Sequence, residues 1–448
     1  MKVNIYNIKN NGKRKYAHFD KRLGLKEAYK YISDPENIAK HNFYPFIYYE
    51  KKMYKFNKEK GIKEKIRPIC YASHIDRCIY QYYSYILNNM YNKKADKINI
   101  DKCAIAYRDN KRKSNIHFAR EVFDFIKTNQ NAYIIVGDFK GFFDNLDHKY
   151  LKEQICKLMN VKILPNDMYA IYKSMTKFSK CRLEDILIVN GLSARYKDIK
   201  ELNSHDTVMD LETFKSFKKN HIIKNKDTVG IPQGSSLSGI FSNIYMMDFD
   251  YKMKKLTEEY NGLYRRYSDD FILVITCENI EKFKRFYEEV INIINNMIGV
   301  SIEQDKTKAY FYCNKTIKNI TNMLMPEIKD EKNIIDYLGF SFDGNSISIR
   351  QKTYGKYIYR MRRKIDGIER NHGITYKGNK INYDKVYEKY SKKGLIRGEK
   401  KSNFISYVRL AKKIFKDEKN ISNIEKNHMR KIAKVIKQKR IKYSEKDL

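Results

Sequence analysis

The sequence LYRRYSDDFILVITC, residues 263–277, places two acidic residues between two apolar segments. LYRRY and FILVITC have the length and composition of β-strands, and only Ser268, Asp269 and Asp270 separate them. This spacing predicts a β-hairpin with carboxylates at its tip. An Asp-Asp pair is most often a solvated turn, so its interpretation depends on what else the chain brings to the hairpin.

A second strand that ends in an acidic residue lies upstream. AYIIVGDF (132–139) is a short apolar run typical of a buried strand, and Asp138 stands at its end. Between this strand and the hairpin, GIPQGSSLSGIFSNIYMMDFDYKMKKL (230–256) predicts a turn that runs into a helix. The three segments predict one α+β unit.

Carboxylates from two strand ends suit phosphoryl transfer. That reaction needs mainly positioning and charge neutralisation, and two divalent ions about 3.5–4 Å apart can stabilise the attacking and the leaving oxygens. Magnesium prefers carboxylate oxygens, substrate phosphates and water. Asp138, Asp269 and Asp270 are therefore candidate ligands of two Mg²⁺ ions.

The charge of the chain indicates a polyanionic partner. Its 91 Lys and Arg against 53 Asp and Glu give a net charge of +38, which attracts nucleic acid. A compositional bias of the source genome could also raise the lysine content. Residues 351–448 hold 30 Lys and Arg against 10 Asp and Glu, a net charge of +20, so over half of the charge lies in the last fifth of the chain.

Several other patterns bound the class of protein. The seven cysteines show no paired CxxC spacing, so we expect free thiols and no zinc ribbon. No apolar run approaches the roughly 20 residues that span a bilayer, and the N-terminus lacks the apolar stretch of a signal peptide. We expect a cytoplasmic protein without a membrane partner.

The remaining segments predict helices and short strands. Helical stretches are expected around residues 74–92 and 114–128, and YLGFSFDG (337–344) and SISIR (346–350) are typical of strands. The chain then becomes basic and helical, with tyrosines interleaved among its cations as in surfaces that bind and stack on nucleic acid. These tyrosines, many of which could equally pack between helices, are Tyr354, Tyr357, Tyr359, Tyr376, Tyr383, Tyr387 and Tyr390.

Three central segments together resemble the palm motifs of reverse transcriptases, in the order of that family. They are DFKGFFDNLDH (138–148), GIPQGSSLSGIFSNIYM (230–246) and YSDDF (267–271). KIRPICYASHIDR (65–77) and AIAYRDNKRKSNIHFA (104–119) resemble the fingers motifs, and YLGFSF (337–342) resembles the strand at the base of the thumb. The resemblance covers about residues 60–350 and implies an α+β right-hand polymerase with fingers, an antiparallel palm sheet and a helical thumb.

The resemblance also implies roles for individual residues. The catalytic residues would be Asp138, Asp269 and Asp270, joined as metal ligands by Phe139. The nucleotide-binding residues would be Arg67, Arg108, Phe143, Gln233, Gly234 and Lys306. Phe143 would be the bulky gate that excludes a ribose 2′-hydroxyl, and Lys306 the proton donor to pyrophosphate. The nucleic-acid-binding residues would be Gly230, Pro232, Tyr267, Lys352, Arg360, Arg362 and Arg363.

Asp144, Asp147 and His148 are expected to be structural. The family often has Ser-Pro where this chain has Ser238-Gly239.

The implied domain division follows the motifs. We expect residues 1–130 to form the N-terminal part of the fingers and residues 131–160 the first part of the palm. Residues 161–224 would be a further fingers region or an insertion. The second part of the palm would follow at 225–345, and a basic helical thumb at 346–448.

The function implied is RNA-directed DNA synthesis from dNTPs, with RNA and the DNA product as partners and a second protein or a homo-oligomer as a further possibility. The YSDD turn, SNIYMMDFD (242–250) and IRQKTYGKYIYRMRRKI (349–365) are most similar to bacterial abortive-infection and defence-associated reverse transcriptases, which suggests antiphage defence with a dedicated non-coding RNA. Three alternatives stay open: untemplated or protein-primed DNA synthesis, a maturase-like RNA-binding protein, and an RNA-dependent RNA polymerase.

Overall fold

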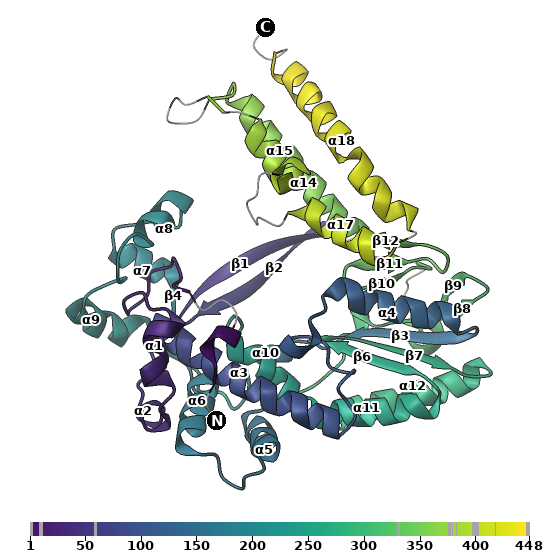
Figure 1. The fold of residues 1–448 in the computed structure, drawn as a ribbon, viewed down its shortest axis with the longest axis horizontal. Helices are drawn as coiled ribbons and strands as arrows, with labels where there is room; N and C mark the ends of the chain where they lie inside the picture. The colour runs from purple at the N-terminus through teal and green to yellow at the C-terminus, as the bar shows by residue number, and fades with distance from the viewer. Residues whose placement is uncertain are drawn as a thin grey trace.

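The computed structural model describes residues 3–8, 12–57, 61–328, 332–374, 378, 380–381, 383–396, 403–416 and 418–444. Figure 1 shows a central sheet with helices on both faces, a long two-stranded ribbon to one side, and a group of helices at the C-terminal end that rises above them.

The central sheet has five antiparallel strands in the order β6-β7-β3-β8-β9. Its strands are β3 (Ala132–Asp138), β6 (Leu263–Tyr267), β7 (Asp270–Thr276), β8 (Lys308–Cys313) and β9 (Thr316–Asn319). The expected strand before Asp138 and the expected hairpin are confirmed. The turn is shorter than expected, because Asp270 already pairs with Tyr267 as the first residue of β7.

Alternating residues of β3 face two different cores, as the pleat of a strand requires. Ile134 packs with Phe123 of α4 (Asn115–Thr128) on one face. Tyr133 and Ile135 pack on the other face, with α11 (Met247–Glu259) and α12 (Ile280–Asn295). Both faces of the sheet are therefore covered by helices (Figure 1).

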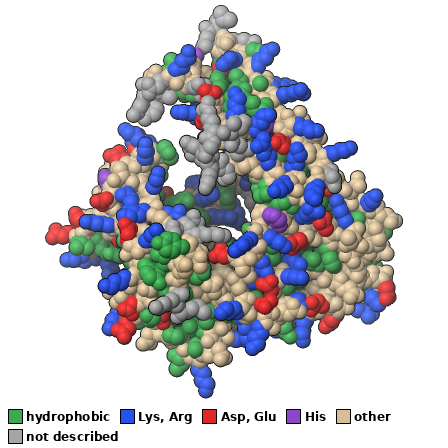
Figure 2. Space-filling view, in the orientation of Figure 1, with side chains coloured by type: hydrophobic (Ala, Val, Ile, Leu, Met, Phe, Trp, Pro, Cys, Tyr) green, Lys and Arg blue, Asp and Glu red, His purple; other side chains and the backbone are tan. Residues whose placement is uncertain are grey.

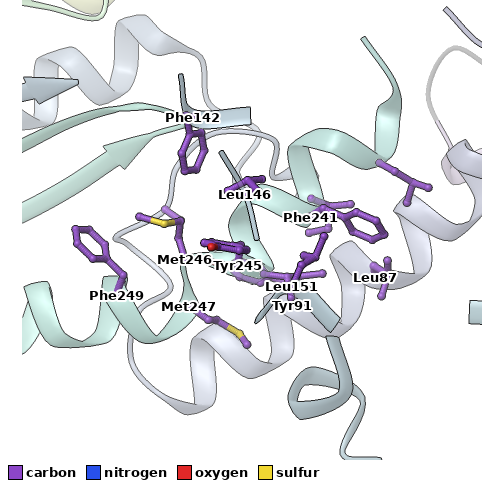
Figure 3. Close-up of a cluster of buried hydrophobic side chains, with 14 of the residues drawn as sticks. Leu87, Tyr91, Phe142, Leu146, Leu151, Phe241, Tyr245, Met246, Met247 and Phe249 are labelled. Carbon is purple, nitrogen blue, oxygen red and sulfur yellow. The ribbon is translucent and has the colours of Figure 1, made fainter. Parts of the chain in front are cut away.

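The helix predicted after the Gly-rich turn is confirmed as α10 (Ser236–Tyr245), which begins at its N-cap Ser235. It is buried on all sides from Leu237 to Tyr245, as is typical of a helix in the core of a large protein. Figure 3 shows Phe241 and Tyr245 of α10 among side chains of α3 (His74–Lys97) and α5 (His148–Met159). This packing holds the turn before α10 against the end of the central sheet.

The long ribbon consists of β1 (Phe46–Asn57) and β2 (Gly61–Tyr71), paired over their full length. It continues into a four-stranded sheet in which β4 (Ser179–Arg182) runs parallel to β1 and β5 (Ile223–Lys224) pairs with β4. The region between the first two palm motifs builds a small separate core on this sheet, which includes Cys181, Leu187 and Phe217.

The C-terminal helices stand on a three-stranded sheet formed by β10 (Ile335–Tyr337), β11 (Phe340–Phe342) and β12 (Ile347–Ile349). Their bounds are α14 (Gln351–Arg370), α15 (Asp384–Tyr390), α16 (Lys393–Ile396), α17 (Phe404–Ile414) and α18 (Lys419–Ser444). Val408 and Ala411 of α17 share a core with Phe340 and with α4. The C-terminal helices are thus continuous with the core of the central sheet.

Most of the remaining helices cover the N-terminal part and the region around the ribbon, whereas α13 (Thr321–Leu324) packs against β8. They are α1 (Leu25–Ile32), α2 (Pro35–Ala39), α6 (Asn166–Thr176), α7 (Leu183–Val189), α8 (Tyr196–Leu202), α9 (Leu211–His221) and α13 (Thr321–Leu324), with short 3-10 turns η1 (Ile5–Asn7), η2 (Asp109–Lys111), η3 (Phe142–Asp144) and η4 (Gln304–Lys306). All seven cysteines are free thiols, as expected. In the described part of the chain, no helix is both long enough and apolar enough to cross a membrane.

Candidate active site

The three acidic residues predicted from the sequence meet at one end of the central sheet. Asp138 and Asp270 are register partners across β3 and β7, and the Phe139 amide donates a hydrogen bond to the Asp269 carbonyl at 3.0 Å. Ser268, at the tip of the hairpin, has a left-handed backbone with φ of 62°. We call residues 263–276 the acidic hairpin.

A cleft of about 470 Å³, which we call the central cleft, opens beside the acidic hairpin. Besides the acidic hairpin, its walls come from the ribbon, the segment of Tyr107, the end of β3 and the segment after it, the turn before α10 with the start of that helix, and the segment that leads into η4. Residues on these walls include Lys65, Arg67, Tyr107, Asp138, Phe139, Phe143, Gln233, Gly234, Asp269, Glu303 and Lys306. Figure 2 shows the molecule hollowed between the ribbon and the C-terminal helices, with Lys and Arg side chains around the hollow.

Like charges crowd this end of the sheet. Partial desolvation and the negative charge of Asp138 raise the pKa of Asp269. Partial desolvation and the charges of Asp269 and Asp138 raise the pKa of Asp270 to about 7. Asp270 lies beside the central cleft without lining it. A nearby cation would relieve this repulsion.

One cation already forms an ion pair with Asp138. Lys306 forms an ion pair with the Asp138 carboxylate, and its Nζ lies 3.9 Å from Glu303 Oε2. The Glu303 amide also donates to the Asp138 carbonyl at 2.8 Å. Glu303 is a further carboxylate of the central cleft that the sequence reasoning missed, although it lies three residues before Lys306 in a segment already of interest.

The donors around the central cleft fit a divalent metal. Asp138 and Asp269 supply carboxylate oxygens, Phe139 lies on the same wall, and Asp270 adds a third carboxylate beside Asp138. Carboxylates of this kind are ligands for hard cations such as Mg²⁺. Within the described residues, no three His, Cys, Asp or Glu side chains form a ready-made metal cluster.

The turn before α10 places Gln233 in the central cleft. The side-chain Nε2 of Gln233 donates to Asp144 Oδ1 at 3.3 Å. The backbone carbonyl of Gln233 accepts a hydrogen bond from the Cys70 backbone amide at 2.8 Å. Gly234 has φ of 122°, and a Cβ there would lie 2.2 Å from the Cys70 carbonyl oxygen. The glycine is therefore needed for contact between this turn and the end of β2.

Gly230 and Pro232 serve the protein's own packing in this structure. Both are buried. The Gly230 carbonyl accepts a bond from His148 Nε2 at 2.7 Å, and the Pro232 carbonyl accepts one from Ser238 Oγ at 2.6 Å. Gln233 and Gly234, which follow them in the same turn, line the central cleft, whereas Gly230 and Pro232 lie beneath the surface.

The two phenylalanines after β3 differ in exposure. Phe142 is buried and packs against Phe139. Phe143 is half-buried and lines the central cleft. This is the placement that a gate residue requires.

The two predicted arginines also differ. Arg67 is exposed on β2 and lines the central cleft. Arg108 is buried, and its guanidinium donates to Asp101 Oδ1 at 2.6 Å and to Asn92 Oδ1 at 2.8 Å. Its donors are bound by the protein, and Arg108 does not line the central cleft.

Tyr107, the residue before Arg108, lies in the central cleft where Arg108 was expected. Tyr107 lines the central cleft, has a left-handed φ of 59°, and donates from its hydroxyl to Ser268 Oγ at 3.1 Å. A Cβ on Gly239 would lie 2.6 Å from the Tyr107 ring, so the glycine in Ser238-Gly239 makes room for it. Tyr107 lies in the segment AIAYRDN (104–110), which resembles a fingers motif, but the resemblance implied a nucleotide-binding role for Arg108 and none for Tyr107.

The remaining predicted nucleic-acid contacts lie outside the central cleft. Tyr267 lines an adjoining cleft of about 490 Å³ on the other side of Tyr107. The predicted cations of α14 are all exposed on that helix, namely Lys352, Arg360, Arg362 and Arg363.

The C-terminal tyrosines divide into packed and exposed positions. Tyr357 and Tyr390 are buried in the core of the C-terminal helices, and Tyr354, Tyr383 and Tyr387 pack against that core. Tyr359 is 64% exposed, and Tyr376 lies outside the described residues. Helix packing therefore accounts for most of them.

The antiparallel sheet and the acidic hairpin bring carboxylates from two strands to one cleft. The profile of the family "Reverse transcriptase (RNA-dependent DNA polymerase)" matches residues 51–342. The chain belongs to the reverse transcriptase family, and the expected right-hand α+β fold class is confirmed.

Three solved telomerase structures are among those similar to this chain. Apo telomerase from Candida tropicalis truncated from its C-terminal domain has 15% identity over 73% of this chain, with a TM-score of 0.40. Apo telomerase from the same organism has 13% identity over 90% of this chain and a TM-score of 0.41. Candida albicans telomerase in complex with a TWJ fragment of telomeric RNA has 16% identity over 92% and a TM-score of 0.38.

The chain spans 61%, 63% and 62% of the lengths of these three telomerase chains. No curated protein matches the sequence. Because the TM-scores are below 0.5, the family membership rests on the sequence match alone.

Proposed function

We propose that this chain is an RNA-directed DNA polymerase that extends a primer with dNTPs. The observation that carries the proposal is the convergence of Asp138 and Asp269 in one cleft with Phe143 and Gln233, inside the segment that matches the reverse transcriptase family. Carboxylates provide the charge for catalysis, and the half-buried ring selects the sugar.

The residues of the central cleft divide the chemistry among them. Asp138 and Asp269, with the Phe139 carbonyl, would hold two Mg²⁺ ions, which when bound stabilise charge on the attacking and leaving oxygens. Arg67 and Lys65 on the ribbon supply positive charge for the triphosphate, a task that suits the fork of arginine.

Two further residues complete the proposed site. Phe143 occupies the space that a 2′-hydroxyl would need. Lys306 holds Asp138 in this structure and carries a proton at Nζ that it can give to pyrophosphate.

The proposed setting is bacterial antiphage defence in the cytoplasm, with a dedicated non-coding RNA as template or scaffold. The resemblance of the YSDD turn and of residues 349–365 to defence-associated reverse transcriptases supports the setting. The net charge of +20 in residues 351–448 supports the RNA partner, because basic surfaces bind nucleic acid through its phosphates.

The test is nucleotide incorporation by the wild-type chain and by Asp269→Asn. The wild type should extend a DNA primer on an RNA template with dNTPs in Mg²⁺. Asp269→Asn should lower the rate about 100-fold or more, while thermal unfolding stays close to wild type because the substitution keeps the size of the side chain and removes a charge that Asp138 repels. Asp124→Asn, on the exposed side of α4, is the matched control and should retain the rate.

The same assay separates the alternatives. Incorporation of rNTPs in preference to dNTPs would indicate an RNA polymerase, and dNTP addition without template would indicate untemplated synthesis. RNA binding without any incorporation would indicate a maturase-like protein and would refute the proposal.

A further inference from the structure

A charged residue lies completely buried beneath the acidic hairpin. Arg266, on β6, has an exposed fraction of 0%, and so does its partner Asp250 on α11. Charged side chains are almost never fully buried unless they are paired. The position of this pair, two residues before the tip of the hairpin, calls for an explanation.

The guanidinium of Arg266 donates two hydrogen bonds to the Asp250 carboxylate. Nε donates to Asp250 Oδ1 at 2.8 Å, and Nη2 donates to Asp250 Oδ2 at 2.7 Å. The Tyr264 hydroxyl adds a third bond to Asp250, at 2.7 Å. Burial alone would lower the pKa of Arg266, but the Asp250 carboxylate raises it, so the arginine stays charged.

The same guanidinium reaches the tip of the acidic hairpin. Arg266 Nη1 donates to the Ser268 carbonyl at 3.1 Å. Ser268 has the left-handed φ of 62°, a conformation that costs free energy in a residue other than glycine. The Ser268 carbonyl belongs to the peptide bond that leads into Asp269, so this contact fixes where the Asp269 backbone begins.

The backbone of Arg266 and the side chain of Asn243 extend the contacts to the segment before Tyr107. The Arg266 amide donates to the Cys103 carbonyl at 2.8 Å, and the Ile105 amide donates to the Arg266 carbonyl at 3.0 Å. Asn243 of α10 accepts from Arg266 Nη2 at 3.3 Å and donates to the Ala106 carbonyl at 2.9 Å. One buried arginine thus joins the hairpin, α10, α11 and the wall of the cleft.

Stability alone is a weak reason for such a pair. A buried ion pair gains little over well-packed apolar side chains of similar volume, because both charges lose their hydration. The acidic hairpin, however, must hold Asp269 and Asp270 near Asp138 although the three carboxylates repel one another. A rigid, fully bonded guanidinium below the turn can resist that repulsion.

We infer that Arg266, held by Asp250, is a positioning residue that sets the metal affinity of the acidic hairpin through the Ser268 carbonyl. The inference rests on the proposed polymerase function for its kinetic consequences only, since metal binding can be measured without catalysis.

The test is Arg266→Lys, which keeps the charge but removes the fork that bonds Asp250 and Ser268 together. Mn²⁺ binding to the purified chain, followed by electron paramagnetic resonance, should weaken about tenfold or more. The kcat should fall about 10- to 100-fold with half-saturation at a higher Mg²⁺ concentration, while the KM for dNTP stays within about twofold.

Arg77→Lys is the matched control. Arg77 also uses its guanidinium within the fold, donating to the Leu23 carbonyl at 2.9 Å and to Gln81 Oε1 at 2.6 Å. It should lose thermal stability without any change in Mn²⁺ affinity. Equal Mn²⁺ affinities for wild type, Arg77→Lys and Arg266→Lys would overturn the inference.

A milder variant covers the case in which Arg266→Lys fails to fold. Tyr264→Phe removes one hydrogen bond from Asp250 and leaves the ion pair in place; it should weaken Mn²⁺ binding in the same direction, by less. Unchanged binding in a folded Tyr264→Phe chain would count against the inference. A wild type that binds Mn²⁺ but adds no dNTP would refute the proposed function while leaving the positioning role open to the binding assay.

Discussion

Asp270 changes charge near neutral pH because it is partly desolvated and because its neighbours Asp269 and Asp138 carry the same charge. Its pKa in the folded chain is about 7, against 3.8 for the free side chain. Between these two pH values the folded state binds more protons than the unfolded state, so stability falls as the pH rises. The contribution of Asp270 is complete below about pH 4 and is lost by about pH 7.

Metal-free thermal unfolding between pH 4 and pH 8 checks this expectation. The melting temperature of the wild type should fall over that window, and Asp270→Asn should flatten the fall because it removes the titrating group. Mg²⁺ should stabilise the wild type more at pH 8 than at pH 5, since the negative charge that Asp270 gains as the pH rises adds to the attraction of the neighbouring carboxylates for a cation. Identical pH profiles for the two chains would contradict the assignment.

Phe143 provides a second expectation about a single side chain. Phe143→Ala should admit rNTPs while retaining dNTP addition, because it opens space beside the sugar and leaves Asp138 and Asp269 in place. We expect the preference for dNTPs over rNTPs to fall about 10- to 100-fold, as a steric difference of a few kcal/mol would give. Competition between dNTPs and rNTPs in primer extension measures it.

The control for this variant is Phe143→Tyr, which keeps the ring and should keep the preference. If Phe143→Ala selects dNTPs as strongly as the wild type, Phe143 is a packing residue and the selection lies elsewhere in the cleft.

Tyr107 and Arg108 show where sequence reasoning about this site reached its limit. A motif gives the order of residues, but the direction of each side chain depends on the backbone. The left-handed φ of Tyr107 turns this residue into the cleft, and Asp101 together with Asn92 binds the next residue in the interior. The partners of Arg108 lie up to 16 positions away, so no local pattern announces them.

Elements with one dominant local signal were predictable, and elements that depend on distant partners were not. The apolar runs at 132–139 and 271–277 are buried strands, and α3 and α4 begin where expected. The ribbon carries polar residues on both faces, so KGIKEKIRPI (60–69) lacks the alternation of apolar and polar residues that predicts a strand. The sequence indicated only a basic segment there, although residues 61–69 lie within β2. The parallel pairing of β4 with β1 joins residues about 130 positions apart, which periodicity cannot reveal.

The junction between the ribbon and the turn before α10 gives a testable consequence. Gly234→Ala places a Cβ 2.2 Å from the Cys70 carbonyl at a φ of 122°, so either the turn or the end of β2 must move. We expect a loss of about 1–3 kcal/mol in the free energy of unfolding and a higher KM for dNTP, because Gln233 moves with the turn. Denaturant titration and steady-state kinetics measure the two effects.

Gly367→Ala is the control for that substitution. Gly367 lies inside α14 with nothing within 4 Å of an added Cβ, so alanine there should stabilise the helix by up to about 1 kcal/mol. An unaltered KM and free energy of unfolding in Gly234→Ala would show that the junction tolerates a shift.

The C-terminal helices cannot be removed as a simple test of RNA binding. Val408, Ala411, Phe415 and Ile421 share a core with α4 and the central sheet. A chain truncated after Arg350 would expose this apolar surface, so a loss of RNA binding could reflect misfolding. Exposed cations of α14 offer a cleaner test, because their side chains are outside the core.

Replacing Lys352, Arg360, Arg362 and Arg363 together by Ala should weaken RNA binding and reduce its dependence on salt. Each phosphate contact releases counterions, so the slope of log K against log salt should become shallower by up to about 3 units if all four contact a single-stranded RNA. The matched control replaces Lys252, Lys255, Lys282 and Arg285, which are exposed on α11 and α12 on the far side of the central sheet from α4 (Figure 1).

Both quadruple variants lose the same charge, so a difference between them reports position and not net charge. Sequencing of the RNA that copurifies with each chain then separates a dedicated partner from general attraction. One enriched RNA, kept by the control and lost by the α14 variant, would support a specific RNA held by the C-terminal helices. Equal losses in both variants, with mixed cellular RNA throughout, would reduce the role of α14 to its share of the +38 charge.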